Sequence, residues 1–211
     1  MYLNLLEVFL ISILPISLIK LKIIPSRFRL ALLLGIFILL AGFIYLQGIS
    51  LIQLGIKTNN LFSAITPYLS SVIISVLVLI VLSKVMRKKS AEKWYEDPHF
   101  LFLFIPISFA QQFLFQGFIL FKLTSVFSST IAIIITALIF GYMHTIYPEP
   151  FFSMILGTLA GLLFATLYAI YPNLLLVSIT HSILNFTAVY LGFFSFVDSG
   201  GIPKKTELRL R

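Results

Sequence analysis

The chain has 211 residues, of which 60% are hydrophobic and only 10% are charged, and its formal net charge is +8. Soluble domains carry about 25% charged residues, so this composition excludes an ordinary soluble globular protein. The sequence has no cysteine, which excludes disulfides, a cysteine nucleophile and thiolate metal ligands.

Apolar runs recur along the whole chain, and each is about long enough to cross a hydrocarbon core of ~30 Å as a helix. We expect seven spans, at Leu3–Ile19, Leu30–Leu46, Pro67–Leu82, Phe100–Phe121, Ser128–Met143, Phe151–Ile170 and Leu174–Phe196. The first run is not a secretory signal, because no basic residue precedes it and no small-residue cleavage site follows it. The sequence therefore predicts an all-α, polytopic transmembrane helical bundle that forms a single membrane domain over residues 1–211.

The basic residues indicate how this bundle is oriented. Thirteen of the 15 fall on one side of a seven-span arrangement: after the first span, after the third span and in the tail at 197–211. Only Lys57 and Lys122 fall on the other side. The positive-inside rule then predicts an N-terminus outside and a cytoplasmic tail, with Trp94, Tyr95 and His99 at the cytoplasmic interface. The net charge thus reflects membrane orientation, and we expect no nucleic-acid partner.

Three connecting or packing features accompany the spans. Asn59–Asn60 is expected to cap the helix that leads into the third span. The turn Thr145–Pro150, TIYPEP, must end the fifth span because its prolines cannot continue a helix. In the sixth span, GTLAG places Gly157 and Gly161 four residues apart, a spacing that favours close helix packing within the core over a dimer interface.

Polar side chains lie inside three of the predicted spans. They are Gln111, Gln112 and Gln116 in the fourth, His144 in the fifth, where it shares a face with Phe140, and the stripe Ser178, His181, Ser182 and Asn185 in the seventh. We expect these helices to face one another, since polar groups that face lipid would stay unpaired. The alternative is that they only join neighbouring helices by hydrogen bonds. In upright helices, His144 and His181 would differ in depth by about 10 Å.

These residues resemble the motifs of the CPBP family, the intramembrane CAAX prenyl endopeptidases and the bacteriocin-processing or immunity (Abi) proteins. FGYMH at 140–144 and HSILN at 181–185 look like its second and third motifs. QQFLFQG at 111–117 aligns with its first motif, which reads Glu-Glu, three residues, Arg and Gly. LGIK at 54–57 is similar to a segment that often precedes the core. The resemblance implies a core of spans four to seven at residues 99–196, after N-terminal spans and loops at 1–98, in a prokaryotic plasma membrane.

The resemblance also implies site positions. In active members the glutamate and the histidines activate a water, and the asparagine helps to bind the oxyanion. Carried onto this chain, the catalytic positions are His144, His181 and Asn185, with Gln111 and Gln112 at the glutamate positions and Gln116 at the arginine position. Phe140, Ser178 and Ser182 are expected to contribute to binding.

All three charges of the first motif are replaced by neutral amides, which removes the usual chemistry. An amide cannot act as a general base, and it cannot supply the anionic ligand of a zinc site with two histidines and a carboxylate. His144 and His181 alone would make a weak site for zinc or another divalent metal, so no cofactor is expected.

Three hypotheses follow for the function. The first is a pseudoprotease that binds a peptide, a lipidated tail or a membrane partner in an intramembrane cavity. The second is an active endopeptidase with an altered site, in which Glu149 of TIYPEP would serve as base unless it is only a solvated loop residue. The third is a channel or transporter for a small solute, for which Pro106 is the only helix break within the motif helices.

Overall fold

A computed structural model of the chain describes residues 2–90, 102–147 and 149–194, and it is helical with no strand in these ranges. Its elements are α1 (Tyr2–Val8), η1 (Phe9–Ile13), α2 (Leu14–Lys20), η2 (Ser26–Phe28), α3 (Arg29–Leu46), α4 (Leu61–Val85), α6 (Phe104–Gln112), η4 (Phe113–Leu120), α7 (Phe121–Thr124), α8 (Ser129–His144), α9 (Pro150–Ile170) and α10 (Leu174–Tyr190). The segments η1 and η4 are π-helical and join their α-helical neighbours without a break, so Tyr2–Lys20 and Phe104–Thr124 are each one continuous run.

The helices of the described ranges match the predicted spans. Five of them have 19 to 25 residues and are apolar enough to cross a membrane, while α8 and α10 are apolar helices of 16 and 17 residues. The predicted all-α membrane bundle is therefore confirmed, and the protein is an integral membrane protein. Trp94, Tyr95, His99 and the predicted tail at 197–211 lie outside the described residues.

Two predicted boundaries were wrong. Helix α4 begins at Leu61 and not at Pro67, and the proline lies inside the helix. Helix α10 ends at Tyr190, well before Phe196. It ends there because Gly192 adopts a left-handed φ of 80°, and the amide of Phe193 then returns to the carbonyl of Ala188 in a glycine-terminated cap.

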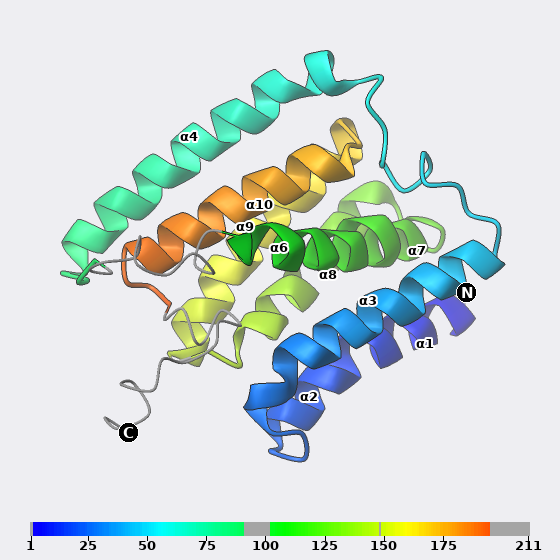
Figure 1. The fold of residues 1–211 in the computed structure, drawn as a ribbon, viewed down its shortest axis with the longest axis horizontal. Helices are drawn as coiled ribbons and strands as arrows, with labels where there is room; N and C mark the ends of the chain where they lie inside the picture. Colours follow the sequence, from blue (N-terminus) through cyan, green and yellow to red (C-terminus); the bar gives the residue numbers. More distant parts are fainter. Residues whose placement is uncertain (1, 91–101, 148, 195–211) are drawn as a thin grey trace.

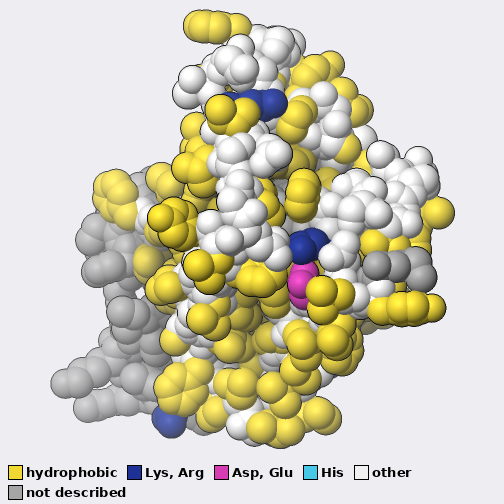
Figure 2. Space-filling view, turned by 90° about the vertical axis from the view of Figure 1, so that its right-hand side faces the viewer, with side chains coloured by type: hydrophobic (Ala, Val, Ile, Leu, Met, Phe, Trp, Pro, Cys, Tyr) yellow, Lys and Arg dark blue, Asp and Glu magenta, His cyan; other side chains and the backbone are white. Residues whose placement is uncertain are grey.

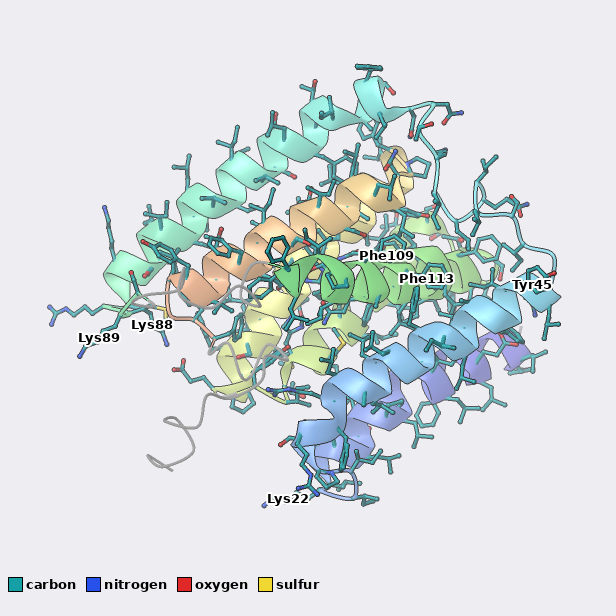
Figure 3. The ribbon with its side chains drawn as sticks, viewed as in Figure 1. Lys22, Tyr45, Lys88, Lys89, Phe109 and Phe113 are labelled. Carbon is teal, nitrogen blue, oxygen red and sulfur yellow. The ribbon has the colours of Figure 1, made fainter. Side chains whose placement is uncertain are left out.

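The run α6–η4–α7 forms the centre of the bundle. Over its most apolar stretch 78% of its residues are buried, against 11% in α3 and in α4. Figure 1 shows α4 and α10 side by side above it, and α3 with α1 and α2 on its other side. The aromatic rings of Phe109 and Phe113, labelled in Figure 3, pack edge-on against Phe37 of α3, with ring centroids 6.1 and 5.0 Å apart.

Helices α8 and α9 share the most extensive contact between two helices in the described ranges, and glycines allow their close approach. A Cβ placed on Gly157 would lie 2.7 Å from the His144 ring, and one on Gly161 would lie 2.9 Å from Cβ of Phe140. Gly141 of α8 is packed equally closely against Thr158 of α9. The interpretation of GTLAG as a packing motif within the core is confirmed.

The connection between α3 and α4 docks onto the turn between α9 and α10. Asn60 does occupy the position before α4, but its side chain makes no cap; its oxygen instead accepts a hydrogen bond of 2.8 Å from the amide of Asn173. The capping prediction is therefore wrong. Asn173, which is fully buried, also donates to the carbonyl of Lys57 and caps α10 by accepting from the amide of Leu176. This links LGIK, the segment at 54–57, to the start of α10.

Charged residues are sparse and unevenly placed. Figure 3 shows Lys22, Lys88 and Lys89 at one end of the bundle, whereas Tyr45 lies at the opposite end. The face seen in Figure 2 is mostly hydrophobic, with a small acidic patch against a basic one. Within the spans, Lys122 pairs with Glu7 at 2.9 Å, which joins α7 to α1.

Candidate functional site

His144 is the last residue of α8, and its side chain is buried against α9. Its Nδ1 lies 2.8 Å from the backbone oxygen of Phe140, one turn earlier. A carbonyl oxygen only accepts, so Nδ1 donates the proton of this bond. In the neutral ring, Nε2 is then left with a free lone pair, which is the arrangement of a base or a metal ligand.

His181 lies in the middle of α10 and is also buried. Its Nδ1 is 2.8 Å from the side-chain nitrogen of Gln112, which comes from α6 and is itself fully buried. The amide NH₂ donates and Nδ1 accepts, so the neutral ring carries its proton on Nε2. This leaves His181 with a donor at Nε2, where His144 has an acceptor.

The two histidines meet around the ring of Phe140. The centroid of that ring is 4.8 Å from the centroid of His144 and 5.4 Å from that of His181, and Phe164 of α9 lies 4.9 Å from His181. The depth difference estimated for upright helices does not keep them apart. Figure 1 shows why: the helices of this core are inclined to one another, with α9 and α10 diverging from the turn that joins them.

A cavity of about 200 Å³ lies beside the two histidines, between α4, α8, α9 and α10. His144, His181 and Asn185 line it together with apolar side chains. On its outer side the lining includes Ile74 of α4 and Leu159 of α9, which are exposed on the surface of the bundle. The cavity therefore opens sideways, where the hydrocarbon of a bilayer surrounds the helices.

A second, much smaller cavity of about 10 Å³ lies on the other side of His144. Gln111, His144, Asn185 and Tyr147 line it, and its volume is close to that of one water probe. Asn185 is held by a hydrogen bond of 3.2 Å from its amide nitrogen to the hydroxyl of Ser108 on α6. Because His144 and Asn185 line both cavities, the predicted residues Gln111, His144, His181 and Asn185 surround one site.

The remaining predicted residues have other surroundings. Ser178 donates to the carbonyl of Leu174 in its own helix, and Ser182 donates to Ser178 and to the carbonyl of Phe104 on α6. Gln116 is fully buried in η4, and neither atom of its amide has a partner. None of these three side chains lines either of the two cavities.

Sequence reasoning missed two residues of this site. Ser108, which positions Asn185, precedes Gln111 and Gln112 by three and four residues in SFAQQ, so helical spacing could have revealed it. Phe164, which packs against His181, could not be found this way because it is one of 22 phenylalanines in apolar runs.

Glu149 lies away from both cavities. Its side chain is 56% exposed and pairs with Lys88 at the end of α4, at an oxygen–nitrogen distance of 2.9 Å. Its backbone is left-handed, with φ of 56°, at the residue before α9 begins. The carboxylate therefore lies on the outside of the turn between α8 and α9.

The residues of the site do not fit a catalytic zinc ion, which takes three protein ligands. In the described part of the chain, no group of three or more His, Asp or Glu side chains could hold a metal. Nε2 of His144 is a suitable ligand, but the neighbouring amides are neutral. What the site does offer is a set of hydrogen-bonding groups, the N–H of His181, the Asn185 amide and the lone pair of His144, at the base of an apolar cavity.

Comparison with known proteins identifies the segment that carries this site. Residues 94–187 match the family of type II CAAX prenyl endopeptidases described as Rce1-like. The match includes Gln111, Gln112, His144, His181 and Asn185. No curated protein and no solved structure matches the chain.

Proposed function

We propose that this chain, a member of the Rce1-like CAAX prenyl endopeptidase family through residues 94–187, is a membrane-embedded pseudoprotease. It binds an apolar or lipidated peptide segment in the cavity beside His144 and His181 and does not hydrolyse it. The observation that carries the proposal is the composition of the site, in which Gln111, His144, His181 and Asn185 come together with no carboxylate among the residues that the structure describes.

The shape and lining of the larger cavity favour a ligand with an apolar body and a polar end. Its outer wall consists of exposed aliphatic side chains such as Ile74, Val78 and Leu159. A lipidated or apolar segment can therefore enter from the bilayer without crossing a polar surface. The peptide groups of this segment would then form hydrogen bonds with the Asn185 amide and the histidines. These bonds offset the cost of burying peptide groups unpaired.

The lack of hydrolysis follows from the chemistry of the amides. Water must lose a proton to attack a peptide bond, and an effective base must be able to accept that proton. Gln111 and Gln112 cannot do so, and Gln112 in addition occupies the acceptor nitrogen of His181. His144 keeps an acceptor at Nε2, but no carboxylate among the described lining residues stands beside it to stabilise the charged ring. Glu149, the base of the alternative hypothesis, is held by Lys88 on the outside.

A working protease and a solute channel therefore have less support. The cavity is lined mainly by apolar side chains and reaches the surface of the helices that faces lipid, which suits a membrane ligand better than a hydrated solute. For orientation, we propose a cytoplasmic location for the end of the bundle that carries Lys22, Lys88 and Lys89, with the N-terminus outside, as the positive-inside rule predicts.

The test uses the full chain in lipid nanodiscs with two fluorescent peptides of one sequence, one carrying a C-terminal farnesylated cysteine and one without the farnesyl group. Binding is followed by anisotropy, and the peptide is weighed by mass spectrometry after incubation. We expect the farnesylated peptide to bind and to stay intact. Cleavage by the parent chain that disappears in His181→Ala would overturn the proposal.

Two further variants connect the result to the cavity. Ala160→Trp fills it and should abolish binding, whereas Ile155→Trp, on an exposed face of the same helix outside the cavity, should bind like the parent. The triple variant Gln111→Glu, Gln112→Glu, Gln116→Arg restores the charges of the family motif. Cleavage by this variant and not by the parent chain would show that the parent chain is inactive because it lacks these charges.

A further inference from the structure

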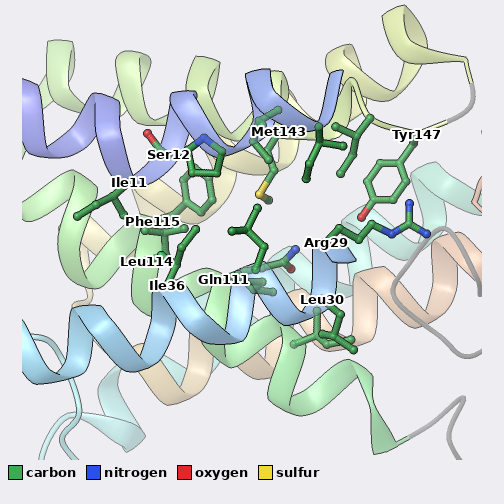
Figure 4. A pocket seen from close by; sticks show the side chains of 17 residues that line it. Ile11, Ser12, Arg29, Leu30, Ile36, Gln111, Leu114, Phe115, Met143 and Tyr147 are labelled. Carbon is green, nitrogen blue, oxygen red and sulfur yellow. The ribbon is translucent and has the colours of Figure 1, made fainter. Parts of the chain in front are cut away.

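A second apolar groove lies on the opposite side of α6 from α4, and the histidines do not line it. It is a cavity of about 70 Å³ between the N-terminal helices, η4 and the end of α8. Figure 4 shows Ile11 and Ile36 toward one end, Leu114 and Met143 along its walls, and Arg29 at the other end. Most of its wall comes from η1, α2 and α3, which precede the segment matched by the family.

One end of this groove is strongly basic. Arg29 lines it, with its guanidinium carbon 5.7 Å from the centroid of the Tyr147 ring, and Figure 4 shows the two side chains next to each other. The connection between α2 and α3 adds Lys20, Lys22 and Arg27, and the ten residues from Lys20 to Arg29 contain no acidic residue. The rest of the groove is apolar, and the hydroxyl of Ser12 within it is already bonded to the carbonyl of Val8.

We propose that this groove binds an anionic phospholipid, with part of one acyl chain between α2, α3 and η4 and the phosphate at Arg29. The helices that form its walls are long and apolar enough to span a membrane, so lipid chains surround them. A groove with an aliphatic interior and a cationic end complements an amphiphile with an apolar tail and an anionic head. Basic pockets between transmembrane helices bind anionic headgroups for the same electrostatic reason.

The bound lipid would lie next to the candidate functional site. Gln111, Ile107 and Tyr147 line the groove and also line the small cavity that contains His144 and Asn185. The acyl chain would therefore contact the reverse side of the helix that carries the degenerate motif. Lipid binding in the groove does not depend on whether the His144–His181 cavity binds a peptide, so the two proposals can fail separately.

Native mass spectrometry of the full chain tests this proposal. The chain is released from detergent after incubation with phosphatidylglycerol or with phosphatidylcholine of the same acyl chains. We expect phosphatidylglycerol to be retained in preference to phosphatidylcholine. Arg29→Ala should weaken its retention by about tenfold, the value of one charge-assisted hydrogen bond. Equal retention of the two lipids would overturn the proposal.

Matched controls distinguish the groove from general attraction to a basic surface. Arg27→Ala removes a charge of the same connection that does not line the groove, and it should retain the lipid better than Arg29→Ala does. Leu33→Trp fills the groove and should reduce retention, whereas Leu34→Trp, its neighbour outside the groove, should not. Equal losses within either pair would contradict the groove as the site. Helicity measured by circular dichroism verifies that each variant is folded.

Discussion

The side-chain nitrogen of Gln112 lies 2.8 Å from Nδ1 of His181, so the amide donates to the ring nitrogen that a carboxylate would bind in its protonated form. The effect is to place the proton of the neutral His181 ring on Nε2. His144 has the opposite arrangement, since the carbonyl of Phe140 accepts from its Nδ1. Gln112, where the family resemblance predicts a glutamate, brings no negative charge to the site and also fixes which nitrogen of His181 can accept a proton.

The first prediction concerns these two tautomers. In ¹⁵N NMR spectra of histidine-labelled protein at neutral pH, His144 should carry its proton on Nδ1 and His181 on Nε2. Gln112→Glu supplies an acceptor and should move the His181 proton to Nδ1, with the His144 signals unchanged as the internal control. A parent spectrum with the His181 proton on Nδ1 would contradict the assignment.

The second prediction concerns Gly157, which leaves room for the His144 ring. A Cβ at this position would lie 2.7 Å from two ring atoms, so Gly157→Ala should destabilise the fold by about 1–3 kcal/mol, the usual cost of overpacking. The free energy of unfolding can be measured in mixed micelles with increasing SDS. Gly42→Ala is the matched control, because no atom lies within 4 Å of the added Cβ and the substitution favours a helix. Equal stability of the two variants would show that His144 moves aside freely.

The third prediction concerns the ion pair between Glu7 and Lys122. Lys122 is buried and lies 5.5 and 5.4 Å from the ring centroids of Phe43 and Phe118. Lys122→Met leaves the Glu7 carboxylate, whose side chain is only 17% exposed, without its cation, which costs up to about 3–5 kcal/mol. The double variant Glu7→Leu, Lys122→Met should recover most of that loss.

An exposed pair serves as the control for this experiment. Lys88 and Glu149 lie 2.9 Å apart, but the Glu149 side chain is 56% exposed. Lys88→Met should therefore cost about 1 kcal/mol or less. If Lys122→Met were as mild as Lys88→Met, the inner pair would have to be solvated, and the argument from burial would be wrong.

The sequence predicted the spans well because hydropathy is a local property of each run. It also predicted that Gln111, His144, His181 and Asn185 converge, since few polar groups are tolerated in a membrane unless they meet. It could not tell which residues of the polar stripe in α10 line the cavity and which bond to neighbouring backbone. Ser182 shares a helix face with His181, yet it bonds to a backbone carbonyl of α6, because periodicity defines a face and not the atoms opposite it.

The sequence could not predict hydrogen bonds between distant loops for a related reason. Asn60 was correctly placed before α4, but its side chain bonds to Asn173, which is 113 residues away. Both a local cap and a distant partner satisfy an asparagine, and only the packing of the loop at 54–57 against the turn before α10 decides between them.

The last prediction concerns Gln116, whose amide is fully buried and has no partner at either atom. An unpaired amide costs about 1–3 kcal/mol by mutational estimates. Gln116→Met, which keeps the length of the side chain, should therefore stabilise the protein by a similar amount in SDS unfolding. Gln112→Met should instead destabilise it, because it leaves Nδ1 of His181 without a donor. A loss of stability in Gln116→Met would instead show that the Gln116 amide supports the fold, as it would if an internal water paired with it.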